Sequence, residues 1–298
     1  MYRTAHRCAR TLACAACAVL AACASRLAQS AWQYDVDAGF SYDSNVNRAY
    51  APADIRADAA FALDASAGRF YAVSGRDGLT LAGEATTEIH HRFAGLNALE
   101  LAASATYRHK FGLGYAAPWI ALRLAAAELQ YRDDLRDGGR VEARIEMGQR
   151  FTPEFDAAVG GVLERRYARH DEPVVPGISG KVFDLRGQVL YARAGYALTD
   201  RLLVAATLAV RRGDVVASTR RDFEIFAASD AIAADPAFGG DFFAYRLRAT
   251  TDAAKLSASW ALDDRSSLNA VYADERTDAA GDIDYRSHSV SVLYAWRY

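Results

Sequence analysis

Apolar and polar residues alternate with a period of two along most of this chain, in stretches of about ten residues or more. From Val141 the sequence reads VEARIEMGQRF, so that Val141, Ile145 and Phe151 share one side of an extended chain and charged residues occupy the other. The same alternation begins at Leu99 and again at Leu202. Because an amphipathic helix would repeat every 3.6 residues, these stretches predict β-strands.

The segments that follow this pattern number about twelve, with an uncertainty of about two. Beyond the N-terminal region, no segment approaches the roughly 20 apolar residues of a membrane helix. We therefore predict an all-β protein, a transmembrane antiparallel up-and-down β-barrel of about 12 strands, within about 10–14. The predicted strands are 31–44, 58–73, 79–93, 97–111, 118–132, 139–151, 155–168, 182–198, 201–213, 242–262, 266–276 and 284–298.

The connections between these segments alternate in length. Counted back from Tyr298, every second connection is a short turn, and the others include three long ones, at 45–57, 169–181 and 214–241. Bacterial outer-membrane barrels have an even number of strands, short periplasmic turns and longer outer loops. The asymmetry therefore predicts two periplasmic termini and location in the outer membrane of a Gram-negative bacterium.

The segment SVSVLYAWRY, at 289–298, places an apolar and aromatic stripe on one face of the last predicted strand. It resembles the C-terminal targeting strand of Gram-negative outer-membrane proteins, although Tyr298 stands where phenylalanine is usual. The resemblance implies that the barrel assembly machinery recognises Tyr294, Trp296 and Tyr298. In physical terms, this strand would pair with the first one and remove the open sheet edges that lipid does not tolerate.

The N-terminal region has the order of a secretory signal peptide. Three arginines precede an apolar run, roughly residues 12–24, which is too short to span a bilayer as a retained helix. We predict a signal peptide over 1–30 and a barrel over 31–298. A second interpretation is a lipoprotein site, in which Cys23 of the Leu-Ala-Ala-Cys stretch would be lipidated.

All four cysteines lie in this N-terminal segment, so the barrel has neither a disulfide framework nor a cysteine metal site. Without residues 1–30 the chain carries 31 basic against 37 acidic side chains, which gives no signature of nucleic-acid binding. No metal motif, phosphate loop or cofactor fingerprint is present. His90 and His91 are adjacent but would point to opposite faces of a strand. We therefore expect no enzyme activity, no cofactor and no metal.

If the apolar faces contact lipid, the charged faces line the lumen. Both signs are interspersed there, which predicts a lumen of weak ion selectivity. It is either a hydrated pore or a ladder of ion pairs that fills the barrel, because about eight strands are filled and sixteen leave a channel. The candidates are Glu84, Glu88, Arg92, Glu100, Arg108, Lys110, Glu142, Arg144, Glu146, Arg150, Glu164, Arg166, Arg186, Arg246 and Arg248, and the same alternation includes Asp156, Asp184 and Asp252.

Two other stretches carry functional hypotheses. The 214–241 segment would fold into the pore, meet a partner or remain mobile. The stretch GFSYDSNVNRAY, at 39–50, contains Asp43-Ser44-Asn45, a turn-forming triplet whose oxygens could otherwise hold a cation. This stretch resembles the start of barrels in a broad set of outer-membrane proteins that includes the barrel domain of the surface lipoprotein assembly modifiers. Their N-terminal helical-repeat domain has no counterpart here.

The function that these patterns favour is passive passage of small solutes through a mixed-charge lumen. One alternative, which the resemblance implies, is an export or surface-assembly barrel that handles a protein or polysaccharide partner. Another is a sealed structural or adhesive barrel. The expected partners are outer-membrane lipid and lipopolysaccharide, the assembly machinery, and either small solutes or an exported polymer.

Overall fold

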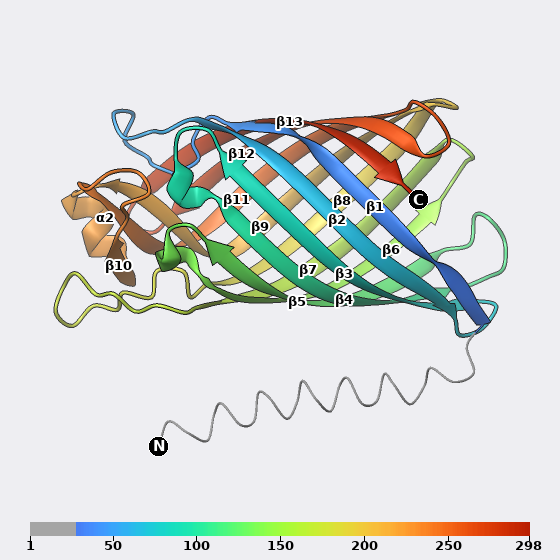
Figure 1. Cartoon of the computed structure of the whole chain (residues 1–298), viewed down its shortest axis with the longest axis horizontal. Helices are drawn as coiled ribbons and strands as arrows, with labels where there is room; N and C mark the ends of the chain where they lie inside the picture. The colour runs from blue at the N-terminus through green and yellow to red at the C-terminus, as the bar shows by residue number, and fades with distance from the viewer. Residues whose placement is uncertain (1–27) are drawn as a thin grey trace, which may run out of the picture.

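The computed structural model describes residues 28–298, which form one closed antiparallel barrel (Figure 1). The predicted signal peptide and Cys23 lie outside these residues, apart from the first residues of β1. The barrel strands are β1 (Ala28–Asp43), β2 (Asp58–Ala72), β3 (Asp77–His90), β4 (Ala98–Lys110), β5 (Trp119–Tyr131), β6 (Gly138–Arg150), β7 (Phe155–Ala168), β8 (Arg186–Thr199), β9 (Leu202–Arg220), β11 (Phe242–Ala261), β12 (Ser266–Ala279) and β13 (Ile283–Arg297). The predicted fold class is thus confirmed.

The barrel closes where the last strand pairs with the first. β13 runs antiparallel to β1 from the pair Arg297–Asp35 to the pair Ser289–Asp43. Gly39 lies in this seam, where a Cβ atom would come 2.1 Å from the carbonyl oxygen of Val292. The two backbones therefore approach each other at a point that only glycine fits.

The two ends of the barrel differ as the sequence predicts. The end that carries the C-terminus has four turns of two to four residues and one connection of eight, at 73–76, 111–118, 151–154, 200–201 and 262–265. The opposite end carries the connections 44–57, 91–97, 132–137, 169–185, 221–241 and 280–282, which we call the outer cap. By the rule for bacterial barrels, we expect the end with short turns to face the periplasm, and we call it the periplasmic end.

The long connection after β9 is shorter than predicted and it is folded. β9 and β11 continue as a pair to Arg220 and Phe242, beyond the point where β9 leaves β8. The remaining residues, 221–241, form the short helix α2 (Phe223–Ala228) and the strand β10 (Ala231–Ala234), which pairs with β11. We call 221–241 the insertion.

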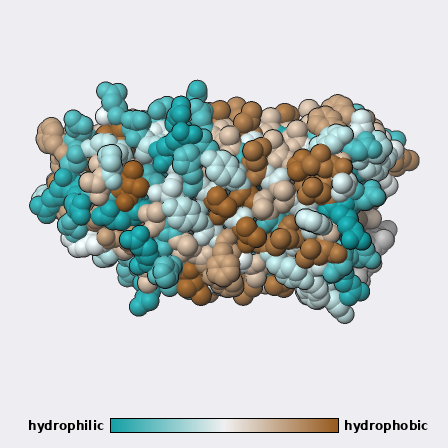
Figure 2. Space-filling view, turned by 90° about the horizontal axis from the view of Figure 1, so that it is seen from above, coloured by the Kyte–Doolittle hydropathy of each residue, from teal (hydrophilic) through white to brown (hydrophobic). Residues whose placement is uncertain are grey.

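On the face of the barrel seen in Figure 2, exposed apolar side chains form a belt over the middle, with hydrophilic residues toward both ends. It comes from strand alternation: Phe40, Leu190, Leu208 and Trp260 are all largely exposed, although their strand neighbours point inward. A surface of this kind is stable against lipid tails rather than water. No helix within 28–298 is long and apolar enough to cross a bilayer.

The aromatic stripe of the last strand belongs to this outward surface. Tyr294, Trp296 and Tyr298 are all exposed at the periplasmic end, and the rings of the last two stack at 5.8 Å between centroids. Their recognition by the assembly machinery remains a prediction.

Candidate functional site: a charged lumen beneath a closed cap

The inward face of the barrel carries ion pairs that bridge alternate strands. Arg123 of β5 donates to Glu84 of β3 at 2.8 Å, across the intervening strand β4. Glu164 of β7 accepts from Arg211 of β9 at 2.8 Å in the same way. Such contacts require side chains that project from a concave surface, so these residues identify the lumen wall.

The lumen contains water-accessible space. The inward side chains of Arg140 and Arg144 are each 43% exposed, and Arg193 and Glu84 are also partly exposed. A barrel filled by its side chains would bury these groups, as a protein core does. The charged side chains therefore leave accessible space between them and do not fill the interior.

The two signs of charge are separated between opposite walls. The inward positions of β1–β3 carry acidic side chains, and among the described residues they carry no lysine or arginine. Besides Arg150 at the rim, the inward positions of β5–β9 carry six arginines, which alternate with fewer acids. The acidic wall includes Asp35, Asp37, Asp43, Asp58, Asp64, Glu84 and Glu88, and the arginine wall includes Arg123, Arg140, Arg144, Arg166, Arg193 and Arg211.

Like charges face each other directly on the arginine wall. Arg123 is paired in register with Arg144, and Arg140 with Arg166. Opposed like charges destabilise a sheet unless counter-charges intervene. For Arg140 the counter-charge comes from Glu100 on β4, across the intervening strand β5. Arg166 instead donates to a backbone carbonyl of the outer cap.

Most of the predicted lumen residues lie on inward faces. Lys110 and Arg150 are the last residues of β4 and β6, so they lie at the periplasmic rim. Arg150 covers the ring of Tyr115 in the adjacent turn. The inward residues within the strands are Glu84, Glu88, Glu100, Arg108, Glu142, Arg144, Glu146, Asp156, Glu164 and Arg166.

Three predicted lumen residues face outward instead. Arg186 shares its face of β8 with the exposed Leu190, and Arg248 and Asp252 share theirs with Trp260 on β11. The prediction failed on β8 because both faces of that strand carry an arginine and aromatic or aliphatic residues. Alternation alone could not tell which of the two faces meets lipid.

Three more of the predicted lumen residues belong to the outer cap. Arg92 follows β3 and donates to the carbonyl of Ala57. Asp184 lies in the 169–185 connection, and Arg246 donates to carbonyls of that same connection. The upper part of β11 lies above the lipid belt, where its apolar residues pack under the cap. Because these apolar residues do not face lipid, their pattern could not show which face of β11 lines the lumen.

Several lumen residues were missed in the sequence. The four arginines and three aspartates among them follow the same alternation as the residues that were found. Arg123, for example, lies between Leu122 and Leu124, which both face outward. The period-two pattern could have identified the whole set: Asp35, Asp37, Asp64, Arg123, Arg140, Arg193 and Arg211.

The insertion, with the strand ends that carry it, contacts every other connection of the outer cap. These connections start from strands all around the barrel, so their meeting point covers the outer mouth. The contacts are Phe238 with Phe93, Asp235 with Arg136, the N–H of Ile232 with the carbonyl of Ser179, Ala228 near Gly281, and Thr219 with Asp54.

The paired ends of β9 and β11 that lie within the cap are buried on both faces. On one face, Leu135 and Phe183 of two other connections pack against Ala244. On the other face, Ile225 of α2 and Ile283 of β13 pack around Tyr245. The cap thus has an apolar core of its own, and it is not a set of independent loops.

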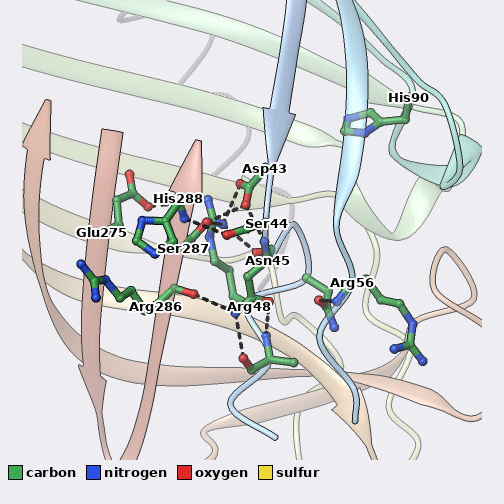
Figure 3. A network of polar contacts seen from close by, with 12 residues as sticks. Asp43, Ser44, Asn45, Arg48, Arg56, His90, Glu275, Arg286, Ser287 and His288 are labelled. Carbon is green, nitrogen blue, oxygen red and sulfur yellow. Dashed lines mark hydrogen bonds and ion pairs between the residues drawn. The ribbon is translucent and has the colours of Figure 1, made fainter. Parts of the chain in front are cut away.

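A polar network fixes the 44–57 connection to the barrel seam (Figure 3). Arg48, which has a left-handed backbone (φ 55), donates to Asp43, to the carbonyl of Asn45 and to Ser287. Asp43 also accepts from the N–H of Asn45 at 2.8 Å. These oxygens are used in turn chemistry. Within 28–298, no group of three or more His, Cys, Asp or Glu side chains could hold a metal ion.

No model of a known protein family matches this sequence, and no curated protein matches it. Several solved structures share the fold. An outer-membrane channel from Pseudomonas putida F1 has a TM-score of 0.52 at 11% identity, with 92% of this chain and 98% of that one covered. The KdgM porin, in complex with disordered oligogalacturonate, has 0.47 at 10%, with 88% and 98% covered.

Barrels of another class are also similar. The translocator domain of the autotransporter NalP from Neisseria meningitidis has a TM-score of 0.40 at 12% identity, with 99% of this chain and 98% of that chain covered. At such identities the likeness concerns the fold alone, which is that of outer-membrane β-barrels.

Proposed function

We propose that this protein is an outer-membrane channel for the passive passage of small solutes, closed at its outer mouth in the conformation described above. The partial exposure of charged side chains inside the barrel carries the proposal. Arg140 and Arg144 keep 43% of their side-chain surface accessible in the interior. Ion pairs that merely filled the barrel would leave no such space.

The separation of charge between the walls adds a property that the sequence did not predict. A field runs across the lumen, from the arginine wall of β5–β9 to the acidic wall of β1–β3. Small dipolar or zwitterionic solutes would align with it and interact favourably with both walls. Strong selectivity for anions or for cations is not expected, because both signs line the path.

The outer cap favours a second candidate, a sealed barrel that acts through its surface. The cap has its own apolar core and a buried ion pair, and both are costly to open. The likeness to surface lipoprotein assembly modifiers stays a prediction, as do contacts with lipopolysaccharide and with the assembly machinery.

Liposome swelling separates the two candidates. The barrel would be reconstituted into liposomes and diluted into isotonic glycine, arabinose or raffinose, beside a variant in which 221–241 is replaced by a short turn. The channel proposal expects uptake of glycine and arabinose by the variant and slower uptake by the native barrel. No uptake by either protein, with folding verified by heat-modifiable gel mobility, would favour the sealed barrel.

A further inference from the structure

A pocket of about 430 Å³ lies on the outer cap, between the 169–185 connection and the insertion. Val174 and Val175 form one side, and Phe223 and Phe226 of α2 form the other. Phe243 of β11 contributes to the lining. The volume is in the range of small-molecule sites, about 300–1,000 Å³.

Phe223 is exposed to a degree that the packing of α2 does not explain. Phe223 is 81% exposed, whereas Ile225 and Phe226 of the same helix supply the contacts with the cap core. The residue therefore contributes little to the fold. An aromatic ring that stands free at the edge of a pocket offers a stacking surface for a ligand.

Arg221 supplies a free positive charge at the same pocket. Its guanidinium lies 5.0 Å from the centroid of the Phe243 ring, and within 28–298 it forms no ion pair with a carboxylate. Asp222 also lines the pocket, but its carboxylate is already engaged in hydrogen bonds. It accepts from the hydroxyl of Tyr50, which holds the pKa of Asp222 below its usual value, and from the N–H of Glu224.

We infer that this pocket binds a small solute that carries a carboxylate on a flat apolar ring. The ring would lie against Phe223 and the valines, and the carboxylate would face the planar guanidinium of Arg221, which suits it by geometry and charge. The pocket is lined by residues of the outer cap and of the end of β11, and by none of the charged residues of the two lumen walls. It therefore goes beyond the proposed channel function and does not depend on conduction.

The probe for the test is 2-naphthoate, whose intrinsic fluorescence reports its surroundings, with 2-naphthalenemethanol as the neutral match. Both would be titrated into the barrel in lipid nanodiscs, with empty nanodiscs as the blank. The inference expects naphthoate to bind about tenfold more tightly than the alcohol, the scale of one charge-assisted hydrogen bond. Arg221→Gln should abolish this difference, and Phe223→Ala should weaken both probes severalfold.

Arg248→Gln is the matched control, because it removes another exposed arginine at the outer end that does not line the pocket. It should leave both affinities unchanged. Equal affinity for the two probes, or binding that survives both pocket variants, would overturn the inference. So would a signal that empty nanodiscs reproduce. Both pocket substitutions affect exposed side chains, and unchanged heat-modifiable mobility would verify that each variant is folded.

Discussion

Arg136, in the connection between β5 and β6, donates to the fully buried carboxylate of Asp235 in the insertion at 2.7 Å. The same guanidinium pairs with Asp133 at 2.7 Å and lies over the rings of Phe183 and Phe238. This arginine therefore joins the insertion to the barrel wall at the centre of the outer cap. Removal of one partner of a buried ion pair typically costs about 3–5 kcal/mol, because the other charge is left without compensation.

Arg136→Leu should accordingly open the cap. The substitution leaves Asp133 and Asp235 close together without their cation, and the two carboxylates would repel each other in a buried site. We expect a large rise in open probability in planar lipid bilayers. Asp241→Asn is the control: Asp241 is 63% exposed and pairs with Arg220 at the surface, where water screens the pair, so its loss should cost little stability and leave gating unchanged. Equal behaviour of the two variants would show that the buried pair does not hold the cap.

The arginine wall should set the ion preference of the open lumen. In a barrel that lacks the insertion, the double substitution Arg140→Gln and Arg144→Gln removes two inward charges from β6. We expect the zero-current potential in a salt gradient to shift toward cation selectivity. Arg186→Gln removes the same type of charge from the outward face of β8 and should cause no shift. A shift with Arg186→Gln alone would contradict the assignment of faces on that strand.

The seam between β1 and β13 should be sensitive to a single methyl group. Gly39→Ala would place a Cβ against the backbone of β13, so we expect a loss of about 1–3 kcal/mol, the usual cost of overpacking. At Gly83 the nearest heavy atom to an added Cβ is 3.9 Å away, so Gly83→Ala should be neutral. The temperature at which the compact gel band is lost measures both variants. A normal temperature for Gly39→Ala would mean that the seam relaxes.

The closed outer cap should become less stable in acid, because carboxylates with lowered pKa values help to hold it closed. The Tyr50 hydroxyl is the main cause of the low pKa of Asp222. Burial alone would raise the pKa of Asp54, but hydrogen bonds from Thr219 and Arg220 lower it further than burial raises it. A carboxylate whose pKa is lower in the folded protein than the unfolded value of about 3.9 stabilises the folded state at pH values above 3.9. It loses that contribution as the pH falls through the pKa of the folded state.

We therefore expect the cap to stay closed between about pH 5 and 8 and to loosen below about pH 4. Asp133 has the opposite sign, because burial raises its pKa and protonation there favours the folded cap. The open probability of the barrel, recorded as a function of pH, measures the balance between these opposing carboxylates. Tyr50→Phe removes the hydrogen bond to Asp222 and should reduce the acid response. Opening centred between pH 5 and 7 would point to other groups.

The architecture could be predicted from the sequence because lipid imposes a strict rule on strands. Side chains must alternate between lipid and lumen over a whole membrane crossing, and twelve such stretches are visible. The predicted asymmetry of turns and loops follows from the same strands. Where one face is strongly apolar, as in the stretch from Val141, the predicted lumen residues lie on the inward face.

The site could be predicted only in part. Alternation is uninformative where both faces are mixed, as around Arg186, and misleading where a strand leaves the lipid, as at Arg246. The closed cap depends on contacts between distant segments, such as Phe93 with Phe238 and Arg136 with Asp235. No local pattern encodes these pairings. The separation of charge between the two walls likewise depends on strand order around the closed barrel.

Single-channel recording in a planar bilayer tests the central claim, that a hydrated lumen lies beneath a closable cap. The native barrel would be compared with the variant in which 221–241 is replaced by a short turn, after heat-modifiable mobility has verified that both are folded. We expect rare, brief openings from the native barrel and steady open steps from the variant. Silence from both proteins would contradict the claim and identify the barrel as sealed.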